Sequence, residues 1–484
     1  MKGALAGPAL ALASRRPVRP PPFRRPARSL IRLSLLLVKA PKRRHFNFIN
    51  GGKRQKNRRR NQTFFYHFLV SIHGSIFRVT GALQSASRKK NSTLCKVDNT
   101  IATVHEVLLK HKPVERRSIS ESAVSAKRIA VIGAGVNGVC IATACASLGH
   151  RVMLFDESKP FDQTSSASSR MLHGGIRYIE HGRIGLVREA LIERDGWLHF
   201  APDATRVERF YCPVYQGAQR GRWLLFAGTL IYQWLAGRFS VGRSQLHSTE
   251  DLEQVFPNLV TRGLRGGASY CDVVMDYELL IQRLVDEARA QDVHIVENTR
   301  VHRLCREGRI DTPDQTLEFD QVINAAGPWA ARLLEVSGID SNFTIDHVRG
   351  SHLILKASFP EALVLQAPGE RRIIFVIPLD TEHVLLGTTE QKHDLPDPII
   401  CTDAESAYLL GILNQHLSEP LAPSDIVSSF AGVRPIVRPR VATIANISAA
   451  SRDSEIEVTD RLISVFGGKW TSARHLGEKV AALV

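Results

Sequence analysis

The chain has 484 residues with a net charge of +17, and 44% of its residues are hydrophobic. That length favours two or three domains, and that hydrophobic content suffices for a well-packed globular body. The seven cysteines show no CxxC pair or other paired spacing, so we expect buried, reduced thiols, with no disulfide framework and no metal site.

All of the basic excess lies in the first quarter of the chain. Residues 1–126 carry 27 Lys and Arg against 4 Asp and Glu, whereas the remaining 358 residues have a net charge of −6. Arg- and Pro-rich runs with no acidic residue before Asp98 bury little apolar surface, so residues 1–126 are predicted to be a disordered leader. Three interpretations remain open: a leader without function, an organelle transit peptide, and a tail for nucleic acid or anionic lipid. Nucleic acid is the least expected partner, because no aromatic residues alternate with the arginines.

Residues 127–484 form the body, which opens with a strand, a helix and a second strand. Residues 129–132 form a short apolar run that is typical of a buried parallel strand. Residues 139–148 are rich in Ala, Cys and Leu and predict a helix. Residues 151–155 predict a second strand, which ends at Asp156. This order is typical of the first half of a dinucleotide-binding fold.

Three glycines in GxGxxG spacing join the first strand to the helix. Gly133 allows a tight turn, Gly135 lets the backbone approach a pyrophosphate, and Gly138 lets the helix pack on the strand. The helix directs its free N–H groups at the phosphates, and Asp156 can accept a hydrogen bond from a ribose hydroxyl. The residues of this loop expected at the cofactor are Gly133, Gly135, Val136, Asn137 and Gly138.

Residues 164–181, TSSASSRMLHGGIRYIEH, decide between NAD and FAD. They form a loop dense in Ser, Thr and Gly that can wrap the middle of a long cofactor, and Gly174 and Gly175 leave room for a flat ring. The hydroxyls that can reach phosphates or ribityl oxygens belong to Thr164, Ser165, Ser166, Ser168 and Ser169. A surface turn with N-capping serines would not explain His173, the double glycine and Arg177 together. The loop therefore favours FAD.

Two later segments also favour FAD. Residues 320–324 predict an apolar strand, which is followed by Ala-Ala-Gly-Pro-Trp-Ala. The small residues of this segment, which include Gly327, let the strand end pass close over the cofactor. Residues 461–484 predict a strand, a double glycine and a helix whose positive end suits negative charge on a flavin. The residues of this segment expected at the cofactor are Gly467, Gly468, Lys469 and Thr471.

Nine segments spread over the body match one flavoprotein family. They are IAVIGAGVNGVCIA, TSSASSRMLHGGIRYIEH, LVREALIERD, INAAGPWA, RGSHLIL, RRIIFVIP, LLGTTE, FAGVRPIV and FGGKWTSAR. On these segments the body resembles the FAD-dependent glycerol-3-phosphate dehydrogenases of the D-amino-acid-oxidase-like flavoproteins. The resemblance implies oxidation of sn-glycerol 3-phosphate to dihydroxyacetone phosphate, with hydride passing from C2 to FAD. It also implies electron delivery to a quinone, or to oxygen in oxidase relatives.

The matched segments supply candidate catalytic residues. A doubly anionic phosphate requires guanidinium or ammonium partners, and the residues that offer them are Arg177, Arg372, Arg434 and Lys469. His173 is the preferred general base for the C2 hydroxyl, with His352 second, and Tyr178 can hydrogen-bond the substrate. Structural alternatives stand beside these roles. His173 would then only contact the flavin, Arg434 would pair with a buried carboxylate, and Arg372 would partly face solvent.

The predicted fold class is α/β, with a Rossmann-like FAD-binding domain assembled from discontinuous segments and an inserted α+β substrate domain. The FAD domain is expected at about 127–200, 272–345 and 430–484, and the substrate domain at about 201–271 and 346–429. Three segments with β-branched residues, RGSHLILKA, RRIIFVIPLD and EHVLLGTTE, predict a sheet over the flavin. Residues 403–417 predict an amphipathic helix, and the apolar run 223–236 is too short to span a bilayer, so it is a core or interfacial helix.

Two other functions are carried beside the dehydrogenase. One is a different FAD oxidase of this fold, acting on an amine or hydroxy acid. The other is a non-catalytic FAD-binding remnant, since family members usually continue into a C-terminal helical domain and this sequence ends at Val484. A quinone or other electron acceptor is the expected partner, and peripheral membrane association and a homo-oligomer stay open. The expected location is the cytoplasm or the cytoplasmic face of the inner membrane if bacterial, or a mitochondrion if the leader is a transit peptide.

Overall fold

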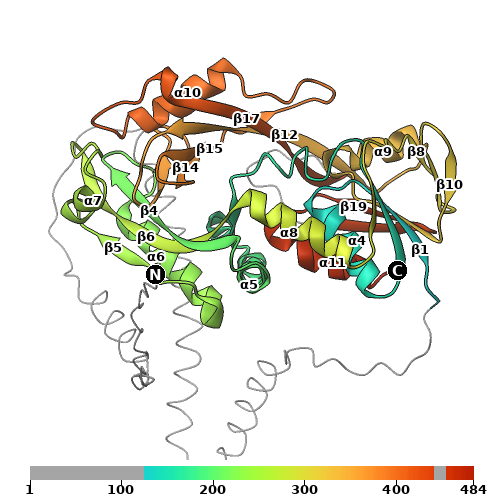
Figure 1. The fold of residues 1–484 in the computed structure, drawn as a ribbon. Helices are drawn as coiled ribbons and strands as arrows, with labels where there is room; N and C mark the ends of the chain where they lie inside the picture. The colour runs from blue at the N-terminus through green and yellow to red at the C-terminus, as the bar shows by residue number, and fades with distance from the viewer. Residues whose placement is uncertain (1–124, 441–453) are drawn as a thin grey trace, which may run out of the picture. The chain divides into compact units, whose positions relative to one another are not determined.

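A computed structural model of the chain describes residues 125–440 and 454–484 (Figure 1). The predicted leader, residues 1–126, therefore lies almost wholly outside the described residues. Within them the chain forms a six-stranded sheet, a ten-stranded sheet and a small three-stranded sheet.

The six-stranded sheet is built from four separate parts of the chain. Its order is β18 (Glu455–Thr459), β19 (Leu462–Phe466), β11 (Gln321–Asn324), β1 (Arg128–Ile132), β2 (Arg151–Phe155) and β7 (His294–Val296). All neighbouring strands are parallel except the antiparallel pair β18–β19. A central parallel sheet must be covered on both faces, which explains why β1 is apolar and buried from Ile129 to Ile132.

Side chains alternate between the two faces of this sheet. Ile129 and Val131 of β1 pack in one core with helices α4 (Val136–Ser147), α8 (Tyr277–Ala290) and α11 (Ala473–Ala481). Figure 1 shows these three helices together beside the sheet. Ala130 and Ile132 point the other way, into a core with helix α9 (Ala330–Val336) and the three-stranded sheet. That sheet has the order β10 (Thr316–Glu318), β9 (Arg309–Asp311) and β8 (Arg303–Leu304).

The ten-stranded sheet is mixed. Its order is β16 (Gln391–Lys392), β12 (Phe343–Lys356), β15 (His383–Gly387), β14 (Ile373–Pro378), β13 (Ala362–Gln366), β4 (Thr205–Tyr215), β6 (Leu264–Met275) and β3 (Met171–Leu172), with β17 (Ile426–Pro439) paired to β12 and β5 (Gln245–His247) paired to β6. Every pairing is antiparallel except β13 with β4.

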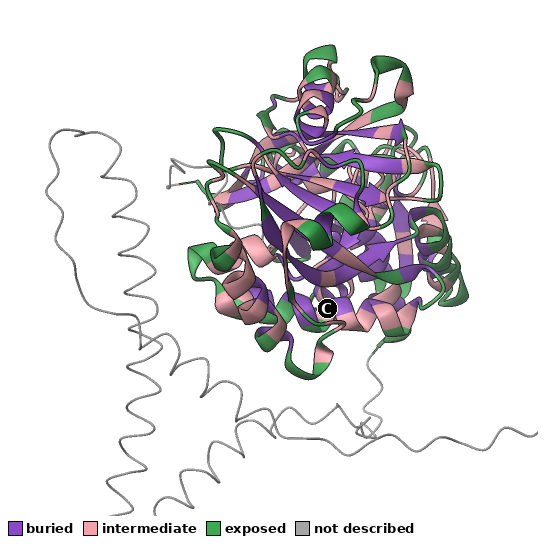
Figure 2. Cartoon of the chain, turned by 90° about the vertical axis from the view of Figure 1, so that its left-hand side faces the viewer, coloured by how far each residue is buried: buried purple, intermediate pink, exposed green. Residues whose placement is uncertain are grey.

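Helices cover both faces of the ten-stranded sheet. α10 (Asp403–Asn414) and α7 (Thr249–Val255) pack over one face, and α5 (Ile184–Phe200) and α6 (Arg222–Ala236) over the other. Short 3-10 helices complete the described fold: η1 (Ile176–His181), η2 (Gly237–Phe239), η3 (Gly327–Trp329), η4 (Pro423–Asp425) and η6 (Trp470–Ser472). Figure 2 shows that buried residues concentrate in the sheets, while exposed residues lie along the outer helices and loops.

The predicted fold class is confirmed, because a largely parallel sheet with flanking helices is assembled from discontinuous segments and joined to a mixed sheet. The predicted domain boundaries stay a prediction. Three long strands run across them: β6 across 271/272, β12 across 345/346 and β17 across 429/430. The predicted helix over 403–417 ends earlier, at Asn414, and the apolar run 223–236 is helix α6. Among the described residues, no helix is both long and apolar enough to cross a bilayer.

Candidate functional site

A cavity of about 640 Å³ lies at the carboxyl ends of the parallel strands β1, β2, β11 and β19. Open α/β sheets bind ligands at this edge. The predicted cofactor residues that line it are Gly133, Gly135, Val136, Asn137, Asp156, Thr164, Ser165, Gly327, Gly467, Gly468 and Lys469. The predicted cofactor residues outside its lining are Gly138, Ser166, Ser169, His173, Gly174 and Thr471. Most of the nucleotide-binding prediction therefore converges on one cavity, while the HGG turn lies beside it.

Each glycine of the loop after β1 permits a close approach. Gly133 has φ +100°, a conformation that side chains disfavour, and a Cβ there would lie 2.6 Å from the carbonyl oxygen of Ala325. A Cβ on Gly138 would lie 1.7 Å from the carbonyl oxygen of Gly133, so only glycine lets α4 start against the loop. Gly138 thus shapes the cavity through packing and not by contact with its contents.

The polar groups around the loop suit an extended dinucleotide. Ser165 Oγ accepts a hydrogen bond from Val136 N at the start of α4 (3.0 Å). Asn137 Nδ2 donates to the carbonyl oxygen of Gly467 (3.0 Å), while its Oδ1 is buried with no hydrogen-bond partner in the described structure. An orphaned buried acceptor costs free energy unless something donates to it, and this one belongs to a cavity-lining residue. The residues present therefore fit FAD.

Asp156 stands where β2 ends. Its Oδ2 accepts from Ala134 N (2.6 Å), and its Oδ1 accepts from both the backbone N and the hydroxyl of Ser158 (2.9 and 3.1 Å). A carboxylate has about four lone-pair sites, so these three bonds leave acceptor capacity for a ribose hydroxyl. The carboxylate also fixes the glycine loop through Ala134, which gives Asp156 a structural role that the sequence did not suggest.

The HGG turn is fixed at each of its three residues. Thr471 Oγ1 accepts from His173 N (3.1 Å), and Tyr232 Oη accepts from Gly174 N (2.7 Å). Gly175, at φ +71°, donates its N–H to His173 Nδ1 (3.0 Å). An Nδ1 that accepts is unprotonated, so the neutral ring carries its hydrogen on Nε2. The hydroxyl of Thr471, predicted at the cofactor, is used here to hold the turn.

Two matched segments meet at the next turn. Gly175 is the N-cap of η1, the 3-10 helix that carries Arg177 and Tyr178. Lys469 Nζ lies 5.4 Å from the centre of the Tyr178 ring, within cation–π range. The structure thus brings Tyr178 close to Lys469, which lines the cavity, from positions almost 300 residues apart.

His352 is buried in β12, with 1% of its surface exposed. Ser169 Oγ lies 2.9 Å from its Nε2, and the ring stacks on Phe430 with ring centres 5.0 Å apart. Burial, with the positive charges of Arg434 and Arg170, lowers the pKa of His352 to about 3. An imidazole with so low a pKa is a poor general base near neutral pH.

Two predicted phosphate ligands contact one loop. Arg434 Nη2 donates to Thr388 Oγ1 (2.9 Å), and Arg372 Nη2 donates to the carbonyl oxygen of Glu390 (3.4 Å). Arg372 also pairs with Glu370 (Nε to Oε2, 3.3 Å). Both arginines therefore hydrogen-bond the loop that follows β15.

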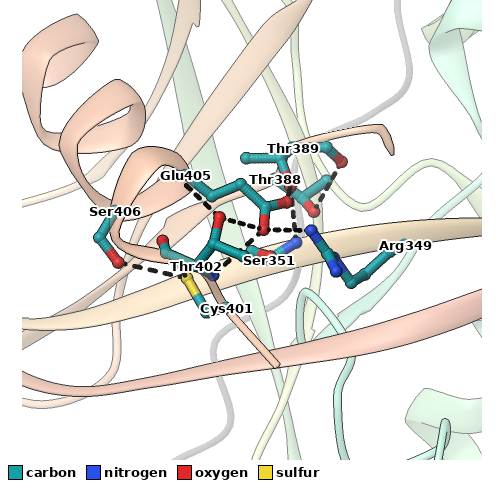
Figure 3. A network of polar contacts seen from close by, with 8 residues as sticks. All are labelled: Arg349, Ser351, Thr388, Thr389, Cys401, Thr402, Glu405 and Ser406. Carbon is teal, nitrogen blue, oxygen red and sulfur yellow. Dashed lines mark hydrogen bonds and ion pairs between the residues drawn. The ribbon is translucent and has the colours of Figure 1, made fainter. Parts of the chain in front are cut away.

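A buried network anchors that loop (Figure 3). Thr389 Oγ1 donates to Glu405 Oε1 (2.7 Å) and accepts from Ser351 N (2.8 Å). Arg349 Nη2 pairs with Glu405 Oε2 (2.8 Å), and Thr402 forms a capping box with Glu405 at the start of α10. Burial raises the pKa of Glu405, but hydrogen bonds from Thr389 and Thr402 outweigh it and hold the carboxyl below its ordinary range. The carboxylate stays charged and ties three elements together.

Some cavity residues carried no sequence signal. Residues 299–302 follow the short parallel strand β7, and Phe161 follows β2, yet neither belongs to a recognisable motif. Their position past the carboxyl end of a parallel strand is the only cue that could have found them. Trp470 also lines the cavity and donates from Nε1 to the carbonyl oxygen of Ser165 (3.0 Å).

Comparison with known proteins identifies the family. The model of the DAO family, described as FAD dependent oxidoreductase, matches residues 128–483. Glycerol-3-phosphate dehydrogenase of Pseudomonas aeruginosa is 34% identical over 367 residues, which cover 72% of this chain and 70% of the relative. D-erythritol 1-phosphate dehydrogenase of Brucella abortus is 31% identical over 367 residues, which cover 72% of both chains.

The fold is shared with solved flavoproteins. The crystal structure of the glycerol-3-phosphate dehydrogenase from Bacillus halodurans, complexed with FAD, superposes with a TM-score of 0.58 at 22% identity. That match covers 75% of this chain and 64% of the other, so this chain spans less than two thirds of that protein. The family match, the identity to the curated relatives and the residues that line the cavity all indicate the same family. The chain belongs to the DAO family of FAD-dependent oxidoreductases.

Proposed function

We propose that the protein oxidises sn-glycerol 3-phosphate to dihydroxyacetone phosphate and delivers the electrons to a quinone. The observation that carries the proposal is the meeting of the HGGIRY and FGGKW segments, where Lys469 lies over Tyr178 at the edge of the cavity. The curated relative from Pseudomonas aeruginosa, named glycerol-3-phosphate dehydrogenase, supports the choice of substrate.

The cavity residues hold the cofactor in this proposal. The loop 133–138 and the start of α4 receive the pyrophosphate, Asp156 accepts from the ribose, and Asn137 Oδ1 accepts from a donor of the cofactor. FAD, when bound, supplies the hydride acceptor. The protein's part is to place the substrate carbon and to manage the proton of its hydroxyl group.

Cationic side chains receive the phosphate. Arg177 precedes Tyr178 on η1, and Arg372 and Arg434 both hydrogen-bond the loop after β15. Guanidinium groups bind phosphate oxygens in pairs, and the charge is worth more in a site from which water is excluded. The anchored Thr389–Glu405 network keeps this loop in place while the arginines change partners from loop to substrate.

His173 acts first as a donor in this proposal. Its ring hydrogen is on Nε2, because Nδ1 accepts from Gly175. Nε2 is therefore the ring nitrogen that can donate a hydrogen bond, and uptake of the hydroxyl proton requires the ring to release the Gly175 bond or to pass its Nε2 proton on. His352, with its pKa held low, hydrogen-bonds but does not store a proton.

An anaerobic titration tests the function. The purified flavoprotein is mixed with sn-glycerol 3-phosphate, D-erythritol 1-phosphate, sarcosine or a 2-hydroxy acid, and the visible flavin absorbance is followed. Bleaching by glycerol 3-phosphate at the lowest concentration is the expected result. Preferential bleaching by sarcosine or the hydroxy acid would replace the proposal with the alternative oxidase. A flavin that no compound bleaches would identify a non-catalytic FAD-binding protein.

We further propose that α6 rests on a membrane surface. Trp223 and Trp234 lie about three helical turns apart on one face, 64% and 76% exposed, and Leu224 is 45% exposed beside them. Arg222 is the first residue of α6, and Arg238 lies in η2, which follows the helix directly. Paired tryptophans with flanking positive charge suit the interface of an anionic bilayer.

Sedimentation with vesicles tests the membrane proposal. The protein should bind vesicles of phosphatidylcholine and phosphatidylglycerol, and the double variant Trp223→Ser/Trp234→Ser should lose most of that binding. Leu279→Ser, at an exposed apolar residue of α8, is the matched control and should bind like the wild type. Equal binding by all three proteins would overturn the assignment to α6.

A further inference from the structure

The HGG turn is connected to a charge pair in the interior of the protein. Gly174 N donates to Tyr232 Oη (2.7 Å), and Tyr232 Oη donates to Asp272 Oδ2 (2.7 Å). Arg194 Nη1 donates to Asp272 Oδ1 (3.1 Å), and its Nη2 donates to the carbonyl oxygen of Phe239 (2.6 Å). The chain of bonds joins α5, α6 and β6 to the turn after β3.

All three side chains lie in the core. Arg194 and Asp272 are each 1% exposed and Tyr232 is 2% exposed. A fully buried ion pair loses much of its Coulomb energy to desolvation, so apolar residues of similar size are often as stabilising. Arg194 also leaves its Nε buried with no hydrogen-bond partner in the described structure. A contribution to folding alone does not account for charges at this place.

The protonation states of Tyr232 and Asp272 keep the chain of hydrogen bonds from Gly174 to Arg194, called the relay below, in one arrangement. Burial, then the charge of Asp272, raises the pKa of Tyr232 well above its ordinary value, so its hydroxyl stays a donor at every physiological pH. Burial raises the pKa of Asp272, and Arg194 with the bond from Tyr232 opposes that rise. Each hydrogen bond therefore has one stable direction, and the donors converge on the carboxylate of Asp272, from Gly174 through Tyr232 on one side and from Arg194 on the other.

The turn is packed closely against α5 and α6 at Gly174. A Cβ on Gly174 would lie 2.6 Å from Leu191 Cγ on α5 and 2.7 Å from Tyr232 Oη on α6. α5 also holds the neighbouring anchor, because Trp197 Nε1 donates to the carbonyl oxygen of Thr471 (2.9 Å). The hydroxyl of that threonine accepts from His173 N. The peptide at Gly174 is therefore set by the relay on one side and by this anchor on the other.

We propose that Arg194, Asp272 and Tyr232 are positioning residues for the oxidation, which fix the HGG turn and thereby the placement of His173 and of η1. The inference rests on the proposed function. It assigns a role to Arg194 of the matched segment LVREALIERD, which no substrate or cofactor contact explains. A displaced turn would leave the cavity at α4 intact while moving the side chains that face the substrate.

Tyr232→Phe is the direct test, because it removes one hydroxyl and keeps the ring. Tyr215→Phe is the matched control, since the buried Tyr215 hydroxyl has no hydrogen-bond partner in the described structure. Hydrogen exchange over residues 171–176 should become about tenfold faster in Tyr232→Phe and stay unchanged in Tyr215→Phe. FAD content should equal that of the wild type in both variants.

Rapid mixing with glycerol 3-phosphate gives the second readout. The limiting rate of flavin reduction should fall about 10- to 100-fold in Tyr232→Phe, with the substrate dissociation constant changed less than about threefold. Unchanged exchange would overturn the relay. Faster exchange with an unchanged reduction rate would overturn the positioning role. If glycerol 3-phosphate fails to reduce the wild-type flavin, the proposed function fails, and the exchange comparison still tests the relay.

Discussion

Gly138→Ala is the sharpest test of the cavity as the FAD site. The added methyl group would lie 1.7 Å from the carbonyl oxygen of Gly133, whereas real Cβ atoms keep at least about 3.0 Å from such an atom. Relief requires the start of α4 to move away from the loop by about 1.3 Å. That shift would also stretch the 3.0 Å bond from Asn137 Nδ2 to the carbonyl oxygen of Gly467, which joins two residues that line the cavity.

The expected loss follows from the movement. Overpacking of this size costs about 1–3 kcal/mol, and the free protein escapes it by letting α4 move. FAD binding must then reverse the shift, because the N–H groups of α4 have to meet the pyrophosphate. The cost therefore appears in cofactor affinity, and FAD should bind roughly 5- to 150-fold more weakly.

The assay is a titration of apoprotein with FAD, followed by quenching of flavin fluorescence, with thermal unfolding in parallel. Gly411→Ala on α10 is the control, because nothing lies within 4 Å of a Cβ built there. That variant should bind FAD normally and gain about 1 kcal/mol in unfolding free energy. A Gly138→Ala protein that binds FAD as tightly as the wild type would refute the assignment of the α4 start to the cofactor.

Three further predictions follow from the site. Arg177→Ala should retain FAD. Its kcat/KM should fall about 30- to 1000-fold for glycerol 3-phosphate and far less for glycerol. Equal losses for the two substrates would show that the arginine holds the loop and does not bind the phosphate. Asp156→Ala should weaken FAD binding by about 1–3 kcal/mol, because it removes the ribose acceptor and frees Ala134 N, and normal flavin content after gel filtration would contradict this. The pKa of folded His352, near 3, lies below its unfolded value of about 6.5, so only the unfolded chain gains a proton as pH falls through this window. Stability should therefore drop by roughly 1.4 kcal/mol between pH 7.5 and 5.5, measured by urea unfolding, and His352→Gln should lack that part of the drop.

Local patterns made the nucleotide half of the site predictable. β1, the glycine loop, α4 and β2 follow one another within 30 residues, and each is specified by nearby residues: apolar runs, glycines and an acid at a strand end. The double glycine before η6 was found in the same way. Such signals survive in a sequence because they do not depend on distant partners.

The rest depended on tertiary packing. The bond from His173 N to Thr471 joins residues 298 positions apart, and the relay from Gly174 through Tyr232 to Asp272 joins three separate elements. No pattern in the sequence pairs such residues, because each partner alone is an ordinary core residue. Whether the His173 ring can act as a general base depends on the N–H group of Gly175, which donates to its Nδ1. Only the geometry of the turn reveals this hydrogen bond.

The paired strands β12 and β17 pass through two cores. Near one end of the pair, Ile345 and Val437 pack against the six-stranded sheet, while at the other end Leu353 and Leu355 pack beneath α10. A hinge needs a few residues that can rotate without breaking a ladder of hydrogen bonds. The ladder of β12 and β17 shifts register at Ile354/Leu355, within the core beneath α10, and is regular between the two cores. The half of the protein built on the six-stranded sheet and the half built on the ten-stranded sheet should therefore unfold in a single cooperative transition. Neither half can be expected to survive as a separately expressed fragment, because β6, β12 and β17 each run across a predicted boundary between them.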